Sequence, residues 1–263
     1  MTLVMGIVNV TPDSFSDGGR FLDPDVAIAH ARSLHAQGAD LLDVGGESTR
    51  PGAERVAPRI EQQRVLPVIE ALASEGLYVS VDTMNAATAR AAVAVGARLV
   101  NDVSGGLADP EMLAAVAESG AEIALGHWRG PSAEMYARAE YGDVVAEVLA
   151  ELRERVDAAE AAGIPRSRVV VDPGIGFGKR GDQNWQVLRA LPRVAELGCR
   201  VLVGTSRKRF LAETIGADAD LVRRDLATAV TSALADRAGA WAVRVHDVPT
   251  TRDALAVARA WEA

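Results

Sequence analysis

Cysteine is nearly absent from this sequence: Cys199 is the single one, so no disulfide can form within the chain. A chain with one thiol fits a reducing compartment. Long apolar runs are absent too, since no uninterrupted stretch approaches the ~18–20 residues of a membrane-spanning helix. The first residues also lack the basic segment and cleavage site of a secretion signal. We therefore expect a soluble cytoplasmic protein that does not act at a membrane.

Positive charge is scarce as well, because 28 Lys and Arg residues stand against 36 Asp and Glu residues, for a formal net charge of −8. This acidic balance argues against a nucleic-acid partner, which needs a basic face. Lysine is the rarer cation, present only as Lys179 and Lys208. In a chain that otherwise uses arginine, a retained lysine indicates a position that needs a compact ammonium. The alternative is chance survival on a surface loop.

The 263 residues are 49% hydrophobic and 24% charged, as in a globular protein. Short, β-branched apolar runs alternate with longer, alanine-rich amphipathic segments. Such runs are typical of parallel strands that are buried on both faces. The expected strands are 3–10, 40–44, 77–81, 98–101, 122–125, 169–172, 200–203 and 241–245. The expected helices are 25–37, 58–74, 86–95, 110–119, 143–162, 184–197, 207–214 with 220–238, and 250–262.

Eight strand–helix units without a linker or a change of composition predict an α/β fold, a single (β/α)₈ barrel that spans residues 1–263 as one domain. An open, doubly wound sheet is the alternative. Helix-start signals agree with this division of the chain. Asp23 and Asp109 each precede a proline, and we expect both carboxylates to cap the helices that follow.

Polar or ionisable residues stand at the end of every expected strand. They are Asn9, Asp43 with Glu47, Asp82, Asn101 with Asp102, His127, Asp172, Ser206 with Lys208, and Arg244 with His246. Any one of them could be a helix cap or a turn former. All of them at one barrel rim predict a functional site. The carboxylates and amides, with one Lys and one Arg, suit a flat heterocycle beside an anionic group.

Two glycine-rich loops need separate interpretation. Residues 176–181 match G-x-G-x-x-G, but the acid that should end the next strand of a dinucleotide fold, Glu196, precedes that strand. We interpret this match as a decoy. The loop 9–19 is long, polar and hinge-rich, as expected of a mobile lid.

Together these loops make the chain resemble the dihydropteroate synthase family of pterin-binding barrels. The matching segments are NVTPDSFSDGG at 9–19, DVGGESTRPG at 43–52, VDT at 81–83, NDVSGG at 101–106, DPGIGFGK at 172–179, SRKRF at 206–210 and RVHD at 244–247. Bacterial members are (β/α)₈ barrels that act as homodimers. The resemblance implies transfer of a pterinylmethyl group in folate biosynthesis: p-aminobenzoate displaces pyrophosphate from 6-hydroxymethyl-7,8-dihydropterin pyrophosphate.

The resemblance also implies roles for individual residues. Pterin would bind to Asp82, Asn101, Asp172, Lys208 and Arg244. Pyrophosphate would bind to Asn9, Thr49, Arg50, Arg244 and His246, with Asn9 also a ligand of Mg²⁺. The p-aminobenzoate would contact Phe15, Thr49, Arg50, Pro51, Phe177, Lys208 and Arg209, a pocket that sulfonamides also occupy. The groups that act on the reacting centre would be Asp17, Asp82, Lys208 and Arg244.

Two positions depart from the family pattern. Gly126 stands where many members have Met, so we expect a slightly more open pterin pocket. Arg209 stands where many have Ser, where it either contacts the p-aminobenzoate carboxylate or points to solvent. Two alternatives to a synthase remain: a methyltetrahydrofolate:corrinoid methyltransferase, which needs no pyrophosphate cradle, and a pterin-binding paralogue without catalysis.

Overall fold

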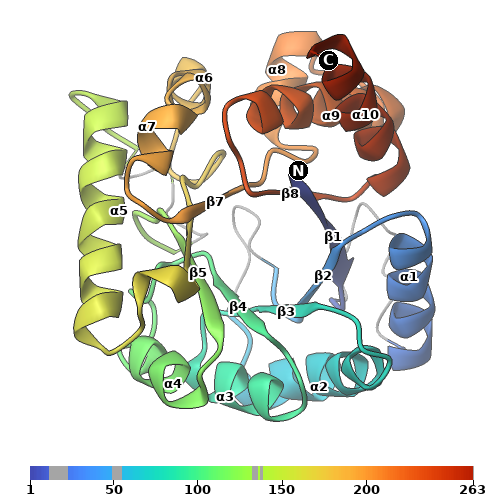
Figure 1. Ribbon diagram of the computed structural model, residues 1–263, viewed down its shortest axis with the longest axis vertical. Helices are drawn as coiled ribbons and strands as arrows, with labels where there is room; N and C mark the ends of the chain where they lie inside the picture. Colours follow the sequence, from blue (N-terminus) through green and yellow to red (C-terminus); the bar gives the residue numbers. More distant parts are fainter. Residues whose placement is uncertain (12–22, 49–54, 132–135, 137–138, 263) are drawn as a thin grey trace.

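The computed structural model describes residues 1–11, 23–48, 55–131, 136 and 139–262. Eight parallel strands pair in chain order and β8 closes on β1, with the helices outside (Figure 1). The predicted (β/α)₈ barrel is thus confirmed and the open sheet was wrong. The strands are β1 (Leu3–Asn9), β2 (Leu41–Gly45), β3 (Val79–Asp82), β4 (Leu99–Asp102), β5 (Glu122–Gly126), β6 (Val169–Asp172), β7 (Arg200–Val203) and β8 (Ala242–Val245).

Helices follow each strand and cover the outside of the barrel. They are α1 (Pro24–Ala36), α2 (Pro58–Ser74), α3 (Ala86–Ala94), α4 (Met112–Ser119), α5 (Val144–Ala161), α6 (Asp182–Arg189), α7 (Leu191–Ala195), α8 (Arg209–Ile215), α9 (Leu221–Arg237) and α10 (Val248–Glu262), with a short 3₁₀ turn, Arg166–Arg168, before β6. None of the helices in the described part of the chain is long and apolar enough to cross a membrane.

Two helix starts differ from the sequence prediction. The expected helix 184–197 is divided at Ala190, because Pro192 lacks an N–H group and its ring opposes a continuous helix; α7 begins with this proline in its first turn. Asp23 caps α1 as expected, its Oδ1 accepting from Asp25 N at 3.0 Å. The prediction that Asp109 caps the following helix was wrong, because α4 begins at Met112 and its N-cap residue is Glu111. Asp109 Oδ1 instead accepts from Glu111 N in the turn before α4, and its Oδ2 accepts from Ala86 N at the start of α3.

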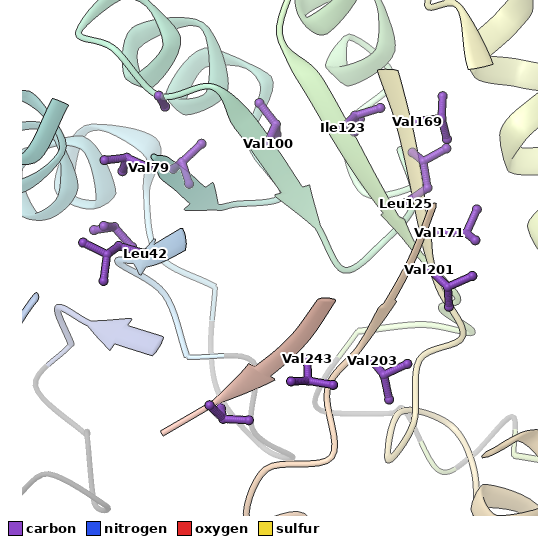
Figure 2. Close-up of a cluster of buried hydrophobic side chains, with 14 of the residues drawn as sticks. Leu42, Val79, Val100, Ile123, Leu125, Val169, Val171, Val201, Val203 and Val243 are labelled. Carbon is purple, nitrogen blue, oxygen red and sulfur yellow. The ribbon is translucent and has the colours of Figure 1, made fainter. Parts of the chain in front are cut away.

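The strand residues alternate between two cores, as the period of a β-strand requires. One set points outward and packs against the helices, and Figure 2 shows members of it around the barrel. The other set fills the barrel interior: Met5, Leu41, Leu99, Ala124, Val170, Leu202 and Ala242. Burial on both sides is the reason the strands read as nearly continuous apolar runs.

The same alternation places the functional side chains. Two residues beyond an interior position, the chain again points inward, now at the carboxyl end of the barrel. Asp43, Asn101, Asp172 and Arg244 each follow an interior residue of β2, β4, β6 or β8 by two positions. The polar rim is therefore the next layer of the barrel interior.

Candidate active site

A cavity of about 1030 Å³ opens at the carboxyl ends of the strands, at the upper limit of the usual size of small-molecule sites. Nine of the predicted site residues line it: Asn9, Asp82, Asn101, Asp172, Phe177, Lys208, Arg209, Arg244 and His246. The other predicted site residues, Phe15, Asp17, Thr49, Arg50 and Pro51, lie outside the described residues, as does the proposed lid of the β1–α1 loop.

Arg244 connects three strands across the floor of the cavity. Its Nε donates to Asp43 Oδ2 at 2.6 Å and its Nη2 to Asp82 Oδ2 at 2.7 Å. Asp43 Oδ2 also accepts from Asn101 Nδ2 at 3.0 Å. Two buried carboxylates thus share one guanidinium. Burial raises the pKa of Asp82 to about 7, although the Arg244 charge opposes the change and Asp43 adds to it.

Asp43 lies at the centre of these contacts, although sequence reasoning placed it at the rim without giving it a role. Its side chain is fully buried, and its contacts orient both Arg244 and Asn101. The signal in the sequence was an ionisable residue at an inward position of an otherwise apolar strand.

Asp172 and Lys208 form the second charged pair. A Cβ placed on Gly204 would lie 3.8 Å from Lys208 Nζ, 4.0 Å from Asp172 Oδ2 and 3.9 Å from Arg244 Cβ, so these three side chains come close to the same point beside the end of β7. Burial lowers the pKa of Lys208 to about 8 and raises that of Asp172, while each opposes the change in the other. A carboxylate beside an ammonium can hold a ring that presents both donors and acceptors.

The segment that carries Lys208 has a strained backbone. Arg207 is the one non-glycine residue with positive φ in the described chain, at 58°. Its side chain donates to both carboxylate oxygens of Asp225 on α9, at 2.7 and 2.9 Å, and its N–H donates to Thr228 Oγ1 at 3.1 Å. These contacts hold a turn that sends Lys208 into the cavity. The neighbouring Ser206 Oγ lies 2.8 Å from His246 Nδ1.

The two departures from the family pattern have structural outcomes. Arg209 lines the cavity mouth, but its side chain is 80% exposed and pairs with Glu213 at 2.7 Å. The expected opening at Gly126 was wrong. A Cβ there would lie 2.4 Å from the Val103 carbonyl oxygen, so the backbone of the β4–α4 loop already occupies that space.

Both lysines lie at this end of the barrel. Lys179 is 1% exposed and also lines the cavity, so chance survival on a surface loop is wrong for this residue. It contacts His127, whose burial lowers the pKa to about 4, with the Lys179 charge adding to the effect. Sequence reasoning marked Lys179 only by the rarity of lysine.

The protein-family model described as "Pterin binding enzyme" matches residues 5–246 of this chain. The parallel barrel with its polar, cavity-lining rim is therefore that of a pterin-binding enzyme. A dihydropteroate synthase of Mycobacterium leprae is 54% identical over 263 residues, covering 98% of this chain and 93% of that protein. A Synechocystis dihydropteroate synthase is 43% identical, over 98% of this chain and 90% of that one.

Solved structures agree. The Xanthomonas albilineans dihydropteroate synthase with 4-aminobenzoic acid matches with a TM-score of 0.92 at 48% identity, covering 100% of this chain and 93% of that one. The Yersinia pestis dihydropteroate synthase with a sulfonamide drug complex matches with a TM-score of 0.94 at 37% identity, covering 99% and 94%. The chain therefore belongs to the dihydropteroate synthase family of pterin-binding enzymes.

Proposed function

We propose that this chain condenses 6-hydroxymethyl-7,8-dihydropterin pyrophosphate with p-aminobenzoate to give 7,8-dihydropteroate and pyrophosphate. The observation that carries the proposal is the convergence of Asp172, Lys208 and Arg244 on one point of the cavity, in a chain that is 54% identical to a dihydropteroate synthase. Solved structures of the Xanthomonas albilineans dihydropteroate synthase contain 4-aminobenzoic acid or 7,8-dihydropteroate, which also supports the proposal.

The pterin binds at the floor of the cavity. Its 2-amino and ring N–H groups form a guanidine-like donor edge. The Asp172 carboxylate accepts two parallel hydrogen bonds from this edge. Because Asn101 Nδ2 donates to Asp43, its carbonyl oxygen is the group left to accept from the pterin. Lys208 donates to the pterin carbonyl and ring nitrogen. The Arg244 guanidinium, held by two carboxylates, stacks on the ring and keeps donors for a phosphate oxygen.

The pyrophosphate binds to Asn9, Thr49, Arg50, Arg244 and His246. An Mg²⁺ ion fits this donor set. Asn9 supplies one amide oxygen at the cavity wall, and the described residues hold no group of three acids, histidines or cysteines that could form an all-protein cage. Mg²⁺ usually keeps several waters and takes its other ligands from substrate phosphates. When bound, it would neutralise charge on the pyrophosphate.

The residues of the chain stabilise charge separation as pyrophosphate leaves. Arg244, Arg50 and His246 attract the departing anion, while Asp82 or Asp17 stabilises the positive charge that develops on the pterin methylene. The amine of p-aminobenzoate then forms the new C–N bond and loses a proton. An arylamine is weakly basic, so this step needs no strong general base. The aryl ring lies against Phe177 and Lys208, with Arg209 at the mouth of the cavity. The family resemblance assigns Phe15, Thr49, Arg50 and Pro51 to the same pocket.

The active form is a homodimer in the cytoplasm. The support for a dimer is an apolar stripe along α9, where Val222, Leu226, Val230 and Leu234 recur every four residues and are each at least half exposed. A second copy of this chain is the proposed partner. The molar mass in solution tests the proposal: Leu226→Glu with Val230→Glu should shift a dimer to a monomer, and a monomeric wild type would contradict it.

The free thiol of Cys199 supports the proposed location in the cytoplasm, because a free thiol fits a reducing compartment.

The decisive experiment incubates the purified protein with dihydropterin pyrophosphate, p-aminobenzoate and Mg²⁺ and assays dihydropteroate by mass spectrometry. Chelation by EDTA should abolish turnover and leave the binding of a pterin without pyrophosphate nearly unchanged. Full turnover in chelator would contradict the role of Mg²⁺. Absence of dihydropteroate under all conditions would contradict the proposed function.

A sulfonamide offers a second test of the aryl pocket. Its sulfonyl oxygens resemble the carboxylate of p-aminobenzoate, so inhibition should be competitive with p-aminobenzoate at saturating pterin, and a pterin–sulfonamide adduct should form. A noncompetitive pattern without an adduct would show that the aryl ring binds elsewhere.

A further inference from the structure

The ammonium of Lys179 is buried beneath the loop that follows Asp172. Lys179 Nζ lies 2.9 Å from the Gly174 carbonyl oxygen, 3.1 Å from that of Phe177 and 3.0 Å from His127 Nδ1. A lysine ammonium has three N–H donors and no acceptor. All three donors are therefore used, and the side chain is 1% exposed.

Burial lowers the pKa of Lys179 to about 7, the Asp172 and Glu151 charges oppose this change, and the surroundings of His127 favour the charged form of Lys179. If His127 Nδ1 accepts from the ammonium, Nε2 carries the ring proton, and Nε2 lies 2.9 Å from Glu151 Oε2. A neutral lysine with a proton on Nδ1 alone would instead turn the Nε2 lone pair toward this carboxylate. Arg129 donates to Glu151, and with the nearby His127 ring it outweighs burial and lowers the pKa of Glu151 to about 2, so Glu151 is ionised. The arrangement is an ammonium, a neutral imidazole and a carboxylate in a row.

The glycines of the supposed dinucleotide motif have a different function. Gly176 and Gly178 of that motif, and Gly174 just before it, have φ of 81°, 57° and 64°, left-handed conformations that glycine adopts without strain. A Cβ on Gly174 would lie 2.3 Å from the His127 carbonyl oxygen, and one on Gly176 would lie 2.6 Å from Lys208 Cδ. The glycine pattern therefore lets the loop wrap around one lysine and pack against the other.

The loop in turn contacts the groups at the aryl end of the cavity. Lys208 Nζ donates to the Ile175 carbonyl oxygen and lies 4.3 Å from the centre of the Phe177 ring. The Gly174 N–H donates to Asp172 Oδ1 at 2.7 Å. Lys179 holds the carbonyls of Gly174 and of Phe177 itself, so it fixes the backbone that positions Ile175 and Phe177.

We propose that Lys179 is a positioning residue: its buried ammonium, held in place by His127, fixes the Gly174–Gly178 loop so that Phe177 and Lys208 form the binding surface for the aryl substrate. The inference rests on the proposed function for the identity of that substrate. Arginine cannot replace Lys179, because its planar fork cannot donate in three directions from one atom.

Lys179→Met tests the inference, because methionine keeps much of the stem and removes the ammonium. We expect the KM for p-aminobenzoate to rise at least tenfold, with the affinity for the pterin in calorimetry changed less than threefold. Hydrogen–deuterium exchange should become faster in residues 174–178, a readout that does not depend on activity. Arg200→Met, which removes a partly buried cation at the opposite end of the barrel, is the matched control and should leave both measurements unchanged.

His127 provides a second pair of variants if Lys179→Met folds poorly. The amide oxygen of His127→Asn can accept from the ammonium near the position of Nδ1, and this variant should retain a near-normal KM. His127→Leu has no acceptor and should behave as Lys179→Met. Unchanged loop exchange and unchanged KM in both Lys179→Met and His127→Leu would overturn the inference, as would equal losses of affinity for both substrates. A wild type that forms no dihydropteroate would instead overturn the proposed function, with the exchange result still deciding whether Lys179 holds the loop.

Discussion

The two ends of the barrel carry similar charged and aromatic residues, but these residues are arranged differently at each end. At the amino-terminal end, Tyr78 donates to Glu122, Arg200 pairs with Glu122 at 2.9 Å, and the Arg200 guanidinium lies 4.6 Å from the centre of the Trp241 ring. Each charge there has a partner. At the carboxyl end, charged side chains surround a cavity of about 1030 Å³ instead of filling it.

The difference is one of charge balance. Asp43 and Asp82 share Arg244, and Asp43 Oδ1 is buried without a hydrogen-bond partner among the described residues. Such a group is costly in the free protein. The amino-terminal cluster therefore stabilises the barrel, while the rim holds its charges ready for a ligand that completes their hydrogen bonds. A separation of stability and activity between the two ends follows, and four predictions test it.

The largest effect is expected from Asp172→Asn at the rim. Loss of the charged acceptor should lower kcat/KM at least 100-fold, about 2.7 kcal/mol. The free energy of unfolding should stay the same or rise, because burial raises the pKa of this carboxyl and its ionised form is unfavourable in the free protein. Steady-state kinetics and urea unfolding measure the two quantities. A variant that lost stability as well would show that Asp172 also holds the rim together.

The backbone of Arg207 should give a smaller effect at the same end. Arg207→Ala and Arg207→Gly both remove the contacts with Asp225, but only glycine adopts the positive φ without strain. A left-handed conformation costs about 1–2 kcal/mol in a residue with a Cβ. We therefore expect the glycine variant to be more stable by this amount and to retain roughly tenfold more activity. Equal values for the two variants would show that the backbone conformation does not position Lys208.

At the amino-terminal end, Glu122→Ala should affect stability alone. It leaves Tyr78 and Arg200 without their partner, at a cost of about 1–3 kcal/mol in the free energy of unfolding. The kcat/KM should remain within threefold of wild type, because the cluster lies at the far end of the barrel interior. Urea unfolding and steady-state kinetics again give both values. A large loss of activity at full folding would mean that the two ends are coupled.

The smallest expected difference between the two ends of the barrel is in the pH dependence of stability. Burial raises the pKa of Asp82 from 3.8 to about 7, so between these values the folded state binds more protons than the unfolded state. This contribution to stability is complete below pH 4 and is lost as the pH rises through 7. Asp82→Asn should remove up to about 1–2 kcal/mol from the stability difference between pH 5.5 and 7.5. Glu122→Gln should not alter this difference, and an unchanged slope in Asp82→Asn would contradict the raised pKa.

The pattern of the chain predicted the barrel closely. The β6 and β7 boundaries match the expected 169–172 and 200–203, and α2 matches 58–74, because apolar runs, glycines and proline starts act locally. The break in the helix after β6 was not predicted, although Pro192 in the sequence was a sufficient signal for it. Residues at strand ends were found for a similar reason: in a parallel barrel the end of every strand reaches the same rim.

The sequence by itself therefore determined the fold, the family and most of the residues around the cavity. Only the tertiary structure decided which of these residues act on one another. Asp43 and Arg244 are far apart in the chain. Because β8 and β2 both pair with β1, closure of the barrel brings Arg244 on β8 within hydrogen-bond distance of Asp43 on β2. The partners of Lys179 come from the residue that follows β5 and from the loop after β6. The space beside Gly126 is filled by a backbone segment that no local pattern predicts. Burial, shared charge and close packing arise between residues on different strands. The separation of these residues along the chain follows no fixed spacing, so the sequence pattern does not predict their contacts.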